Sequence, residues 1–158
     1  TENMSTQPSF FKTFSGEYRK LLSIQLFAWV IAIVVIAAGW VKPLGSIDLD
    51  RLLQVIAVLI GFGAVLVGAM LFKKKLEAVK TSGTAVREKL EAYAKAARLQ
   101  WNLLIGASLF SLFSYFMVGN WAFAALGLTF LAVYGALNPF KQKVMLQLRL
   151  SEADVAGL

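Results

Sequence analysis

The chain has 158 residues, of which 58% are hydrophobic and 16% are charged, and its formal net charge is +7. Soluble domains have about 45–50% apolar and roughly 25% charged residues, so neither intrinsic disorder nor an ordinary soluble domain fits this composition. Cys and His are both absent. Their absence excludes disulfides, thiol nucleophiles, His-ligated haem, the usual zinc sites and imidazole acid–base chemistry.

Four long apolar runs follow one another along the chain, at 21–41, 52–72, 101–118 and 121–137, and none contains Asp, Glu, Lys or Arg. Each has roughly 17–21 residues, close to the length that a helix needs to cross a hydrocarbon layer of about 30 Å. One such run could be a buried helix of a soluble protein, but a chain this small could not bury four. The sequence therefore predicts an all-α integral membrane protein, built as a four-helix bundle with four spans.

Basic residues gather before the first run, between the second and third runs, and after the fourth. The opposite side holds only Lys42 and Arg51, beside Asp48 and Asp50. Because cytoplasmic segments of membrane proteins are enriched in Lys and Arg, both termini and the central segment are predicted to be cytoplasmic. The positive charge thus indicates topology and requires no nucleic acid. The basic residues of the cytoplasmic side are Lys12, Arg19, Lys20, Lys73, Lys74, Lys75, Lys80, Arg87, Lys89, Lys95, Arg98, Lys141, Lys143 and Arg149.

The segment 1–20 precedes the first run and is predicted to be an amphipathic helix at the membrane interface. Phe10, Phe14 and Tyr18 recur every four residues, among the cations Lys12, Arg19 and Lys20. Aromatic rings with flanking cations suit the headgroup layer. The alternative is that these rings merely continue the first span. Met4 is interpreted as the natural start, residues 1–3 as an expression remnant, and the first run as an uncleaved span.

The sequence predicts two transmembrane segments, 21–72 and 101–137. Each contains two of the apolar runs, joined by a short connection. Pro43 is predicted to end the first span and Asp50 to cap the second. Gly119 is expected in the left-handed conformation that closes a helix, with Asn120 capping the next one. The third and fourth spans should therefore form a tight antiparallel hairpin.

The central segment 73–100 is predicted to extend the second and third spans into a cytoplasmic helical hairpin with a turn at 81–84. Val86, Leu90, Tyr93 and Ala97 lie at helical spacing. Two interpretations stay open: a stem that docks a partner, or a basic element that sets topology and contacts anionic lipid. Residues expected to contact lipid headgroups or a partner are Lys12, Arg19, Lys20, Lys73, Lys74, Lys75, Arg87, Lys95 and Arg98.

The cytoplasmic tail, 138–158, begins at Asn138 and Pro139, which should end the fourth span. Val144, Met145 and Leu148 predict a short amphipathic helix beside the membrane. A further cap is expected at 151–154.

Small residues form stripes along the spans at helical spacing. In lipid, helices associate through close packing of small residues, so the stripes predict contact surfaces. They either close the four-helix bundle or form an oligomer interface. The stripes of the second and fourth spans are Ala57, Gly61, Ala64 and Gly68, and Ala125, Thr129, Ala132 and Ala136.

Reactive chemistry is not indicated, and we expect no catalytic residue, metal or cofactor. No charge lies inside a span, and Glu91 is accounted for by an ion pair with Lys95. The remaining polarity inside the spans includes Ser108, Ser111, Ser114 and Tyr115. These hydroxyls either line a pore or small pocket, or make hydrogen bonds between helices and to the backbone four residues earlier.

The second half of the chain resembles small uncharacterised bacterial membrane proteins. The resemblance rests on 89–93 (KLEAY), 104–110 (LIGASLF), Gly119-Asn120 and 138–143 (NPFKQK). It implies a four-span protein of the bacterial inner membrane, of a kind sometimes labelled transporter-like.

Three functions follow from the sequence as hypotheses. The first is a non-enzymatic scaffold, accessory subunit or homo-oligomer that contacts itself or another membrane protein. The second is an oligomeric channel or small-solute carrier lined by the hydroxyls of the third span. The third is a sensor of anionic lipid surfaces.

Overall fold

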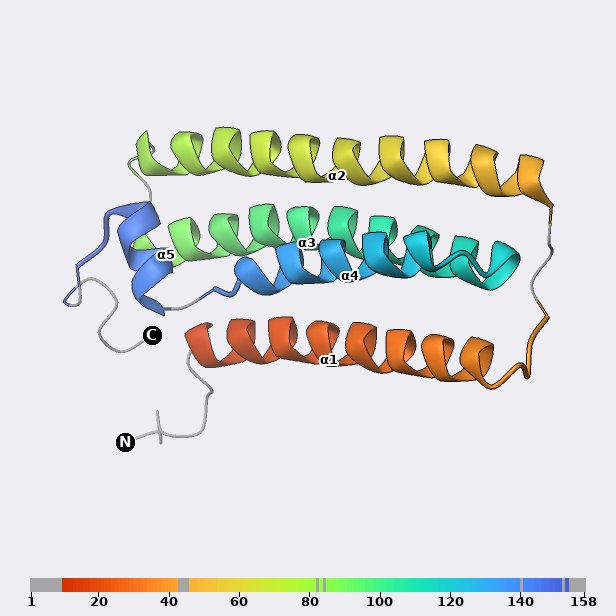
Figure 1. The fold of residues 1–158 in the computed structure, drawn as a ribbon. Coiled ribbons are helices and arrows are strands. Elements are labelled where there is room, and N and C mark those ends of the chain that lie inside the picture. The colour runs from red at the N-terminus through yellow and green to blue at the C-terminus, as the bar shows by residue number, and fades with distance from the viewer. Residues whose placement is uncertain are drawn as a thin grey trace.

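The computed structural model describes residues 10–42, 46–81, 83, 85–139, 141–151 and 153. At position 141 it describes the backbone but not the side chain. Across these residues the fold is all-α and has five helices, shown in Figure 1. They are α1 (Phe10–Ala37), α2 (Ile47–Thr81), α3 (Val86–Val118), α4 (Trp121–Ala136) and α5 (Lys141–Leu148). The predictions on Met4, Pro43, the turn at 81–84 and the cap at 151–154 fall wholly or partly outside the described residues.

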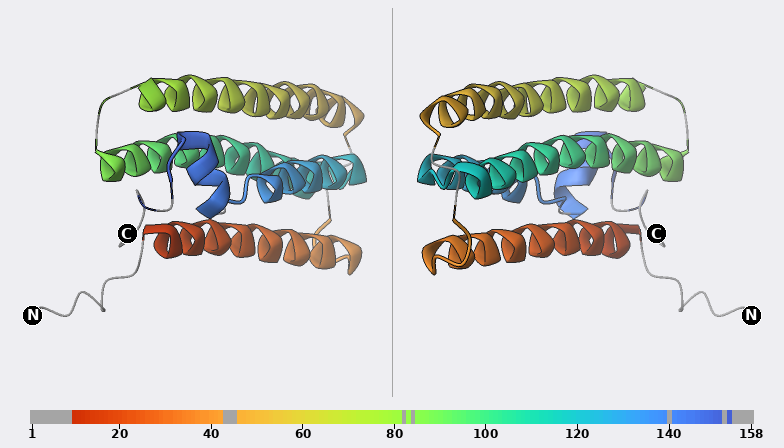
Figure 2. Two further views of the ribbon diagram at one scale, coloured as in Figure 1. Left: turned by 90° about the vertical axis from the view of Figure 1, so that its left-hand side faces the viewer. Right: turned by 90° about the vertical axis from the view of Figure 1, so that its right-hand side faces the viewer.

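The first four helices run side by side, with α3 and α4 between α1 and α2 (Figures 1 and 2). Helix α3 is central because it packs against α1, α2 and α4. Within the described residues, α1, α2 and α3 are long and apolar enough to cross a membrane. Helix α4 is apolar but has only 16 residues, a length of about 24 Å. The structure therefore confirms the all-α class and three candidate spans.

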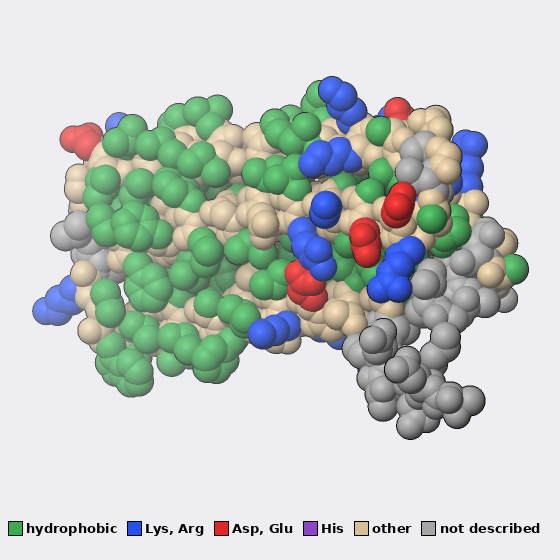
Figure 3. Space-filling model, turned by 180° about the vertical axis from the view of Figure 1, so that it is seen from behind, with side chains coloured by type: hydrophobic (Ala, Val, Ile, Leu, Met, Phe, Trp, Pro, Cys, Tyr) green, Lys and Arg blue, Asp and Glu red, His purple; other side chains and the backbone are tan. Residues whose placement is uncertain are grey.

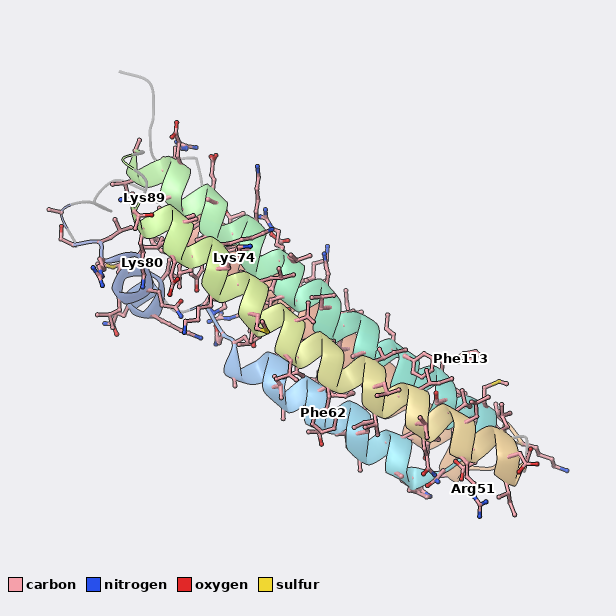
Figure 4. The ribbon with its side chains drawn as sticks, turned by 90° about the horizontal axis from the view of Figure 1, so that it is seen from above. Arg51, Phe62, Lys74, Lys80, Lys89 and Phe113 are labelled. Atoms are coloured by element: carbon pink, nitrogen blue, oxygen red, sulfur yellow. The ribbon has the colours of Figure 1, made fainter. Side chains whose placement is uncertain are left out.

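Charged side chains gather at the end of the bundle that holds Thr81, Val86 and α5, which we call the basic end. Figure 3 shows hydrophobic side chains over most of one face and a concentration of Lys, Arg, Asp and Glu toward this end. Figure 4 labels Lys74, Lys80 and Lys89 there, and Arg51 at the opposite end. The fold thus brings together basic residues from α1, α2 and α3 that are far apart in sequence.

Helix α1 begins at Phe10 and continues without a break through the first apolar run. Phe14 and Tyr18 are buried inside the bundle, where the Phe14 ring stacks on Trp101 at 4.9 Å between centroids. The expectation that these rings lie among lipid headgroups is therefore wrong. The reason is that α3 continues N-terminal to its apolar run, so that Tyr93, together with Trp101 at the start of the run, packs against the two rings and buries them.

At the basic end, α2 and α3 are both continuous helices well beyond their apolar runs, as predicted. The apolar face of this pair is covered by the chain itself. Leu90, Tyr93 and Ala97 are buried in one cluster with Phe14 of α1 and Leu148 of α5. A partner that docks on the hairpin would therefore meet its charged outer face.

Glycine ends two of the helices. Gly39 has φ 72° and lies in a turn where the Trp40 amide donates to the Val35 carbonyl, so α1 ends at Ala37, ahead of Pro43. Gly119 has φ 67° and its amide donates to the Tyr115 carbonyl at 2.8 Å. A left-handed backbone of this kind suits Gly at a helix C-terminus.

Of the two predicted N-terminal caps, the one of α4 is present in the structure and the one of α2 is not. Asn120 caps α4 as predicted, accepting from the Ala122 amide at 2.9 Å. The cap of α2 is Ser46, whose hydroxyl accepts from the Leu49 amide at 3.3 Å, and the prediction of Asp50 as the cap is wrong. Asp50 lies in the first helical turn and accepts instead from the Asn120 side chain at 3.1 Å, which ties α2 to the α3–α4 turn.

Candidate functional site

The small residues of α2 mostly face inward. Ala57, Gly61 and Gly68 are buried and Ala64 is half-buried. A Cβ atom added at Gly61 would overlap the Phe130 ring of α4, and one at Gly68 would lie 3.3 Å from Gln100 Cγ of α3. This stripe is thus used for packing within the chain.

A close contact that the sequence analysis missed joins α1, α3 and α4. The Trp29 indole is 2% exposed, and its Nε1 donates to the Ser108 hydroxyl at 2.9 Å. A Cβ added at Gly127 would overlap the same indole. A bulky aromatic in one run and a bare glycine in another are signals of such a contact, but the sequence does not pair them.

The small residues of α4 lie on the opposite side of that helix. All four residues of the predicted stripe are exposed, while the bundle-facing side of α4 is formed by Phe123, Ala124, Gly127, Phe130 and other residues. The Thr129 hydroxyl donates to the Ala125 carbonyl at 2.8 Å. The outward face therefore carries only small side chains, and its one hydroxyl is hydrogen-bonded within the helix. This face consists of Ala125, Thr129, Ala132 and Ala136.

The hydroxyl groups of α3 are enclosed by the chain's own helices. Ser108 accepts from Trp29, while Ser111 and Ser114 donate to the carbonyls of Ala107 and Phe110 at 3.1 and 2.9 Å. All three serines are buried. The hydrogen-bonding interpretation of these serines is confirmed. The Tyr115 hydroxyl is also buried, and no partner for it lies within the described part of the chain.

A reciprocal tyrosine pair, also unforeseen, joins α1 to α4 near the basic end. The rings of Tyr18 and Tyr134 stack at 4.7 Å, and each hydroxyl donates to the backbone carbonyl of the other residue. Both phenols are thereby satisfied inside the protein, which buried hydroxyl groups require.

The predicted basic contact residues fall into two groups. Arg98 is bound within the chain, because its Nη2 and Nε donate to the Glu17 carboxylate at 3.0 and 3.1 Å and its guanidinium lies 5.9 Å from the Phe14 ring centroid. Arg87 lies 3.7 Å from Glu91. The expected pairing of Glu91 with Lys95 is therefore replaced by one with Arg87. The second group, which is exposed as Arg87 and Arg98 also are, consists of Lys12, Arg19, Lys20, Lys73, Lys74, Lys75 and Lys95.

A small pocket of about 190 Å³ lies at the basic end, between α2, α3, α5 and the segment that leads into α5. Its lining includes Phe72, Gln100, Trp101 and Lys143. The Tyr93 hydroxyl, also in the lining, donates to Gln147 Oε1 at 2.7 Å, and burial raises the pKa of Tyr93 to about 12. The pocket is smaller than the 300–1,000 Å³ or so of sites for drug-sized ligands, so it suits a small polar group at most.

Within the part of the chain that the structure describes, no group of three or more acidic, Cys or His residues is placed to hold a metal ion. What the fold offers for recognition is an outward small-residue face on α4 and an exposed set of lysines at the basic end. Comparison with models of protein families, with curated proteins and with solved structures finds no match to this chain.

Proposed function

We propose that the protein is a non-enzymatic, four-span integral membrane protein of the bacterial inner membrane that acts by assembling with a second copy of itself. The gathering of basic residues at one end of the bundle supports an orientation with that end in the cytoplasm. Both termini and the α2–α3 extension then share the cytoplasmic side. Helix α4 would cross as the short fourth span, with local thinning of the bilayer or tilting of its longer neighbours.

The outward α4 face carries the proposal. Lipid tails are as apolar as Leu, so a lipid-facing helix gains nothing from a row of small residues. Two helices do gain from it, because their backbones can approach closely and increase van der Waals contact. The α2 stripe already serves this purpose inside the bundle, through Gly61 and Gly68. The α4 stripe has no such use within the described chain, since all its members are exposed.

The experiment is a dilution series in lipid. Protein labelled for single-molecule photobleaching is reconstituted into bilayers over a wide range of lipid-to-protein ratios, and the dimer fraction gives a dissociation constant. We expect Ala132→Leu to raise that constant at least tenfold, a change of about 1.4 kcal/mol. Ala37→Leu places the same side chain at an exposed position of α1 and serves as the matched control.

Wild-type protein that stays monomeric at every ratio would overturn the proposal. Equal dissociation constants for Ala132→Leu and Ala37→Leu would also overturn it, because the α4 face would then play no special part in association.

A further inference from the structure

An open groove runs along the outer side of the α2–α3 pair. It has a volume of about 500 Å³ and is lined mainly by apolar side chains. A Cβ added at Gly63 or at Gly106 would meet nothing within 4 Å, and both bare backbone positions belong to the lining, so part of the groove is the space that their missing side chains leave open. Its lining includes Ile60, Gly63 and Val67 of α2, and Asn102, Gly106 and Phe110 of α3.

The groove lies within the apolar runs, at the depth of the hydrocarbon in the proposed orientation. A groove of this kind is filled by whatever surrounds the helices, and in a bilayer that is an acyl chain. Its volume falls within the range of about 300–1,000 Å³ found for ligand sites. The lining would discriminate little between acyl chains, so any selectivity must come from the headgroup.

Two lysines lie beyond the end of the groove nearest the basic end. Lys74 follows Val67 by seven residues, and Lys95 precedes Asn102 by seven. Seven residues are nearly two helical turns, so each lysine lies on the face of its helix that lines the groove, about 10 Å farther along. Both lysines are exposed, and Figure 4 shows Lys74 in the charged part of α2.

Two polar side chains of α3 near the lysines, Arg98 and Asn102, bear on where a phosphate would bind. Arg98, on a neighbouring face of α3, is already bound to Glu17. The Asn102 side chain is exposed at the groove's charged end, where an amide can donate to an ester carbonyl. Apolar groove, amide and ammonium groups follow one another in the same order as acyl chain, ester and phosphate in a phospholipid.

We propose that this groove binds one anionic phospholipid, with an acyl chain between Gly63 and Gly106 and the phosphate held by Lys74 and Lys95. The inference rests on the membrane orientation of the proposed function but not on self-association. It assigns the α2–α3 lysines a specific ligand rather than a diffuse attraction to the membrane surface.

The test counts bound lipids on the monomer by native mass spectrometry, so its outcome is independent of dimer formation. Detergent-solubilised protein is titrated with phosphatidylglycerol or with phosphatidylcholine carrying the same acyl chains. We expect one tightly bound phosphatidylglycerol per monomer. The double variant Lys74→Gln/Lys95→Gln should bind it about thirty-fold more weakly, since each basic residue near the headgroups contributes roughly fivefold. Its affinity for phosphatidylcholine should be unchanged.

A second pair of variants tests the contribution of the groove to lipid binding separately from that of the lysines. Gly106→Leu fills the groove, and Gly135→Leu adds the same side chain at an open glycine of α4. The first should lose the tightly bound phosphatidylglycerol and bind phosphatidylcholine more weakly, and the second should bind both lipids as the wild type does, with equal helix content by circular dichroism confirming that both fold. Retained binding in Gly106→Leu, or unchanged phosphatidylglycerol affinity in the double lysine variant, would overturn the proposal.

Discussion

The contact of Gly127 with Trp29 makes the strongest stability prediction. A Cβ at position 127 would overlap the indole and lie 2.8 Å from its Cε2. The ring has little freedom to move, because it is 2% exposed and held by its hydrogen bond to Ser108. Overpacking of a tight core costs about 1–3 kcal/mol, and loss of that hydrogen bond adds about 1 kcal/mol. The higher helix propensity of Ala returns about 1 kcal/mol. We therefore expect Gly127→Ala to destabilise the fold by about 1–3 kcal/mol.

The matched control is Gly63→Ala, in the middle of α2, where a Cβ meets nothing within 4 Å. At that position only the higher helix propensity of Ala affects the free energy of unfolding, so the control should be as stable as the wild type or more stable by up to about 1 kcal/mol. Both variants are compared by titrating the protein with SDS in mixed micelles and following tryptophan fluorescence together with circular dichroism. The free energy of unfolding is read from the common transition.

A double-mutant cycle tests whether Trp29 is the cause. Phe at position 29 lacks the part of the indole that a Cβ at 127 would overlap. In a Trp29→Phe background, Gly127→Ala should therefore lose most of its destabilising effect, giving a coupling energy of at least about 1 kcal/mol. If Gly127→Ala is as stable as Gly63→Ala, or if the two substitutions are additive, the packing argument is refuted.

Three further predictions concern the basic end and α3. Arg98→Gln should lower the free energy of unfolding by no more than about 1 kcal/mol, because Arg98 and Glu17 are 45% and 39% exposed; a much larger loss in the same SDS titration would contradict this. Tyr93→Phe should cost about 1 kcal/mol at pH 8 through the lost bond to Gln147. Since burial raises the pKa of Tyr93 to about 12, from about 10 when unfolded, the wild type should lose stability as the pH rises from 10 to 12, and the Phe variant less, as measured at pH 9 and 11.5. Ser111→Ala removes only a bond to the chain's own backbone, so its stability should change by less than about 1 kcal/mol; a collapse of the fold would show a role that the structure does not contain.

The sequence by itself determined where the helices lie and how charge is divided between the ends of the bundle. Runs free of charge marked the apolar parts of α1, α2 and α3, and the Gly119-Asn120 pair marked the tight turn and the cap of α4. These features depend on local chemistry, since capping and left-handed backbone are properties of a few neighbouring residues. The burial of the serine hydroxyls against the backbone was also foreseeable for the same reason.

Only the tertiary structure decided which side of each helix faces its neighbours. In an amphipathic helix polar residues mark the outer face, but where a helix is apolar on all sides hydropathy cannot tell the inner face from the outer one. Helix α4 shows this most clearly, because it packs through Phe123, Gly127 and Phe130 and leaves its small-residue stripe outside. The pairing of Trp29 with Ser108, 79 residues apart, and of Tyr18 with Tyr134, 116 residues apart, likewise depends on how the helices meet. Such contacts are long-range, and no local pattern in a single sequence specifies them.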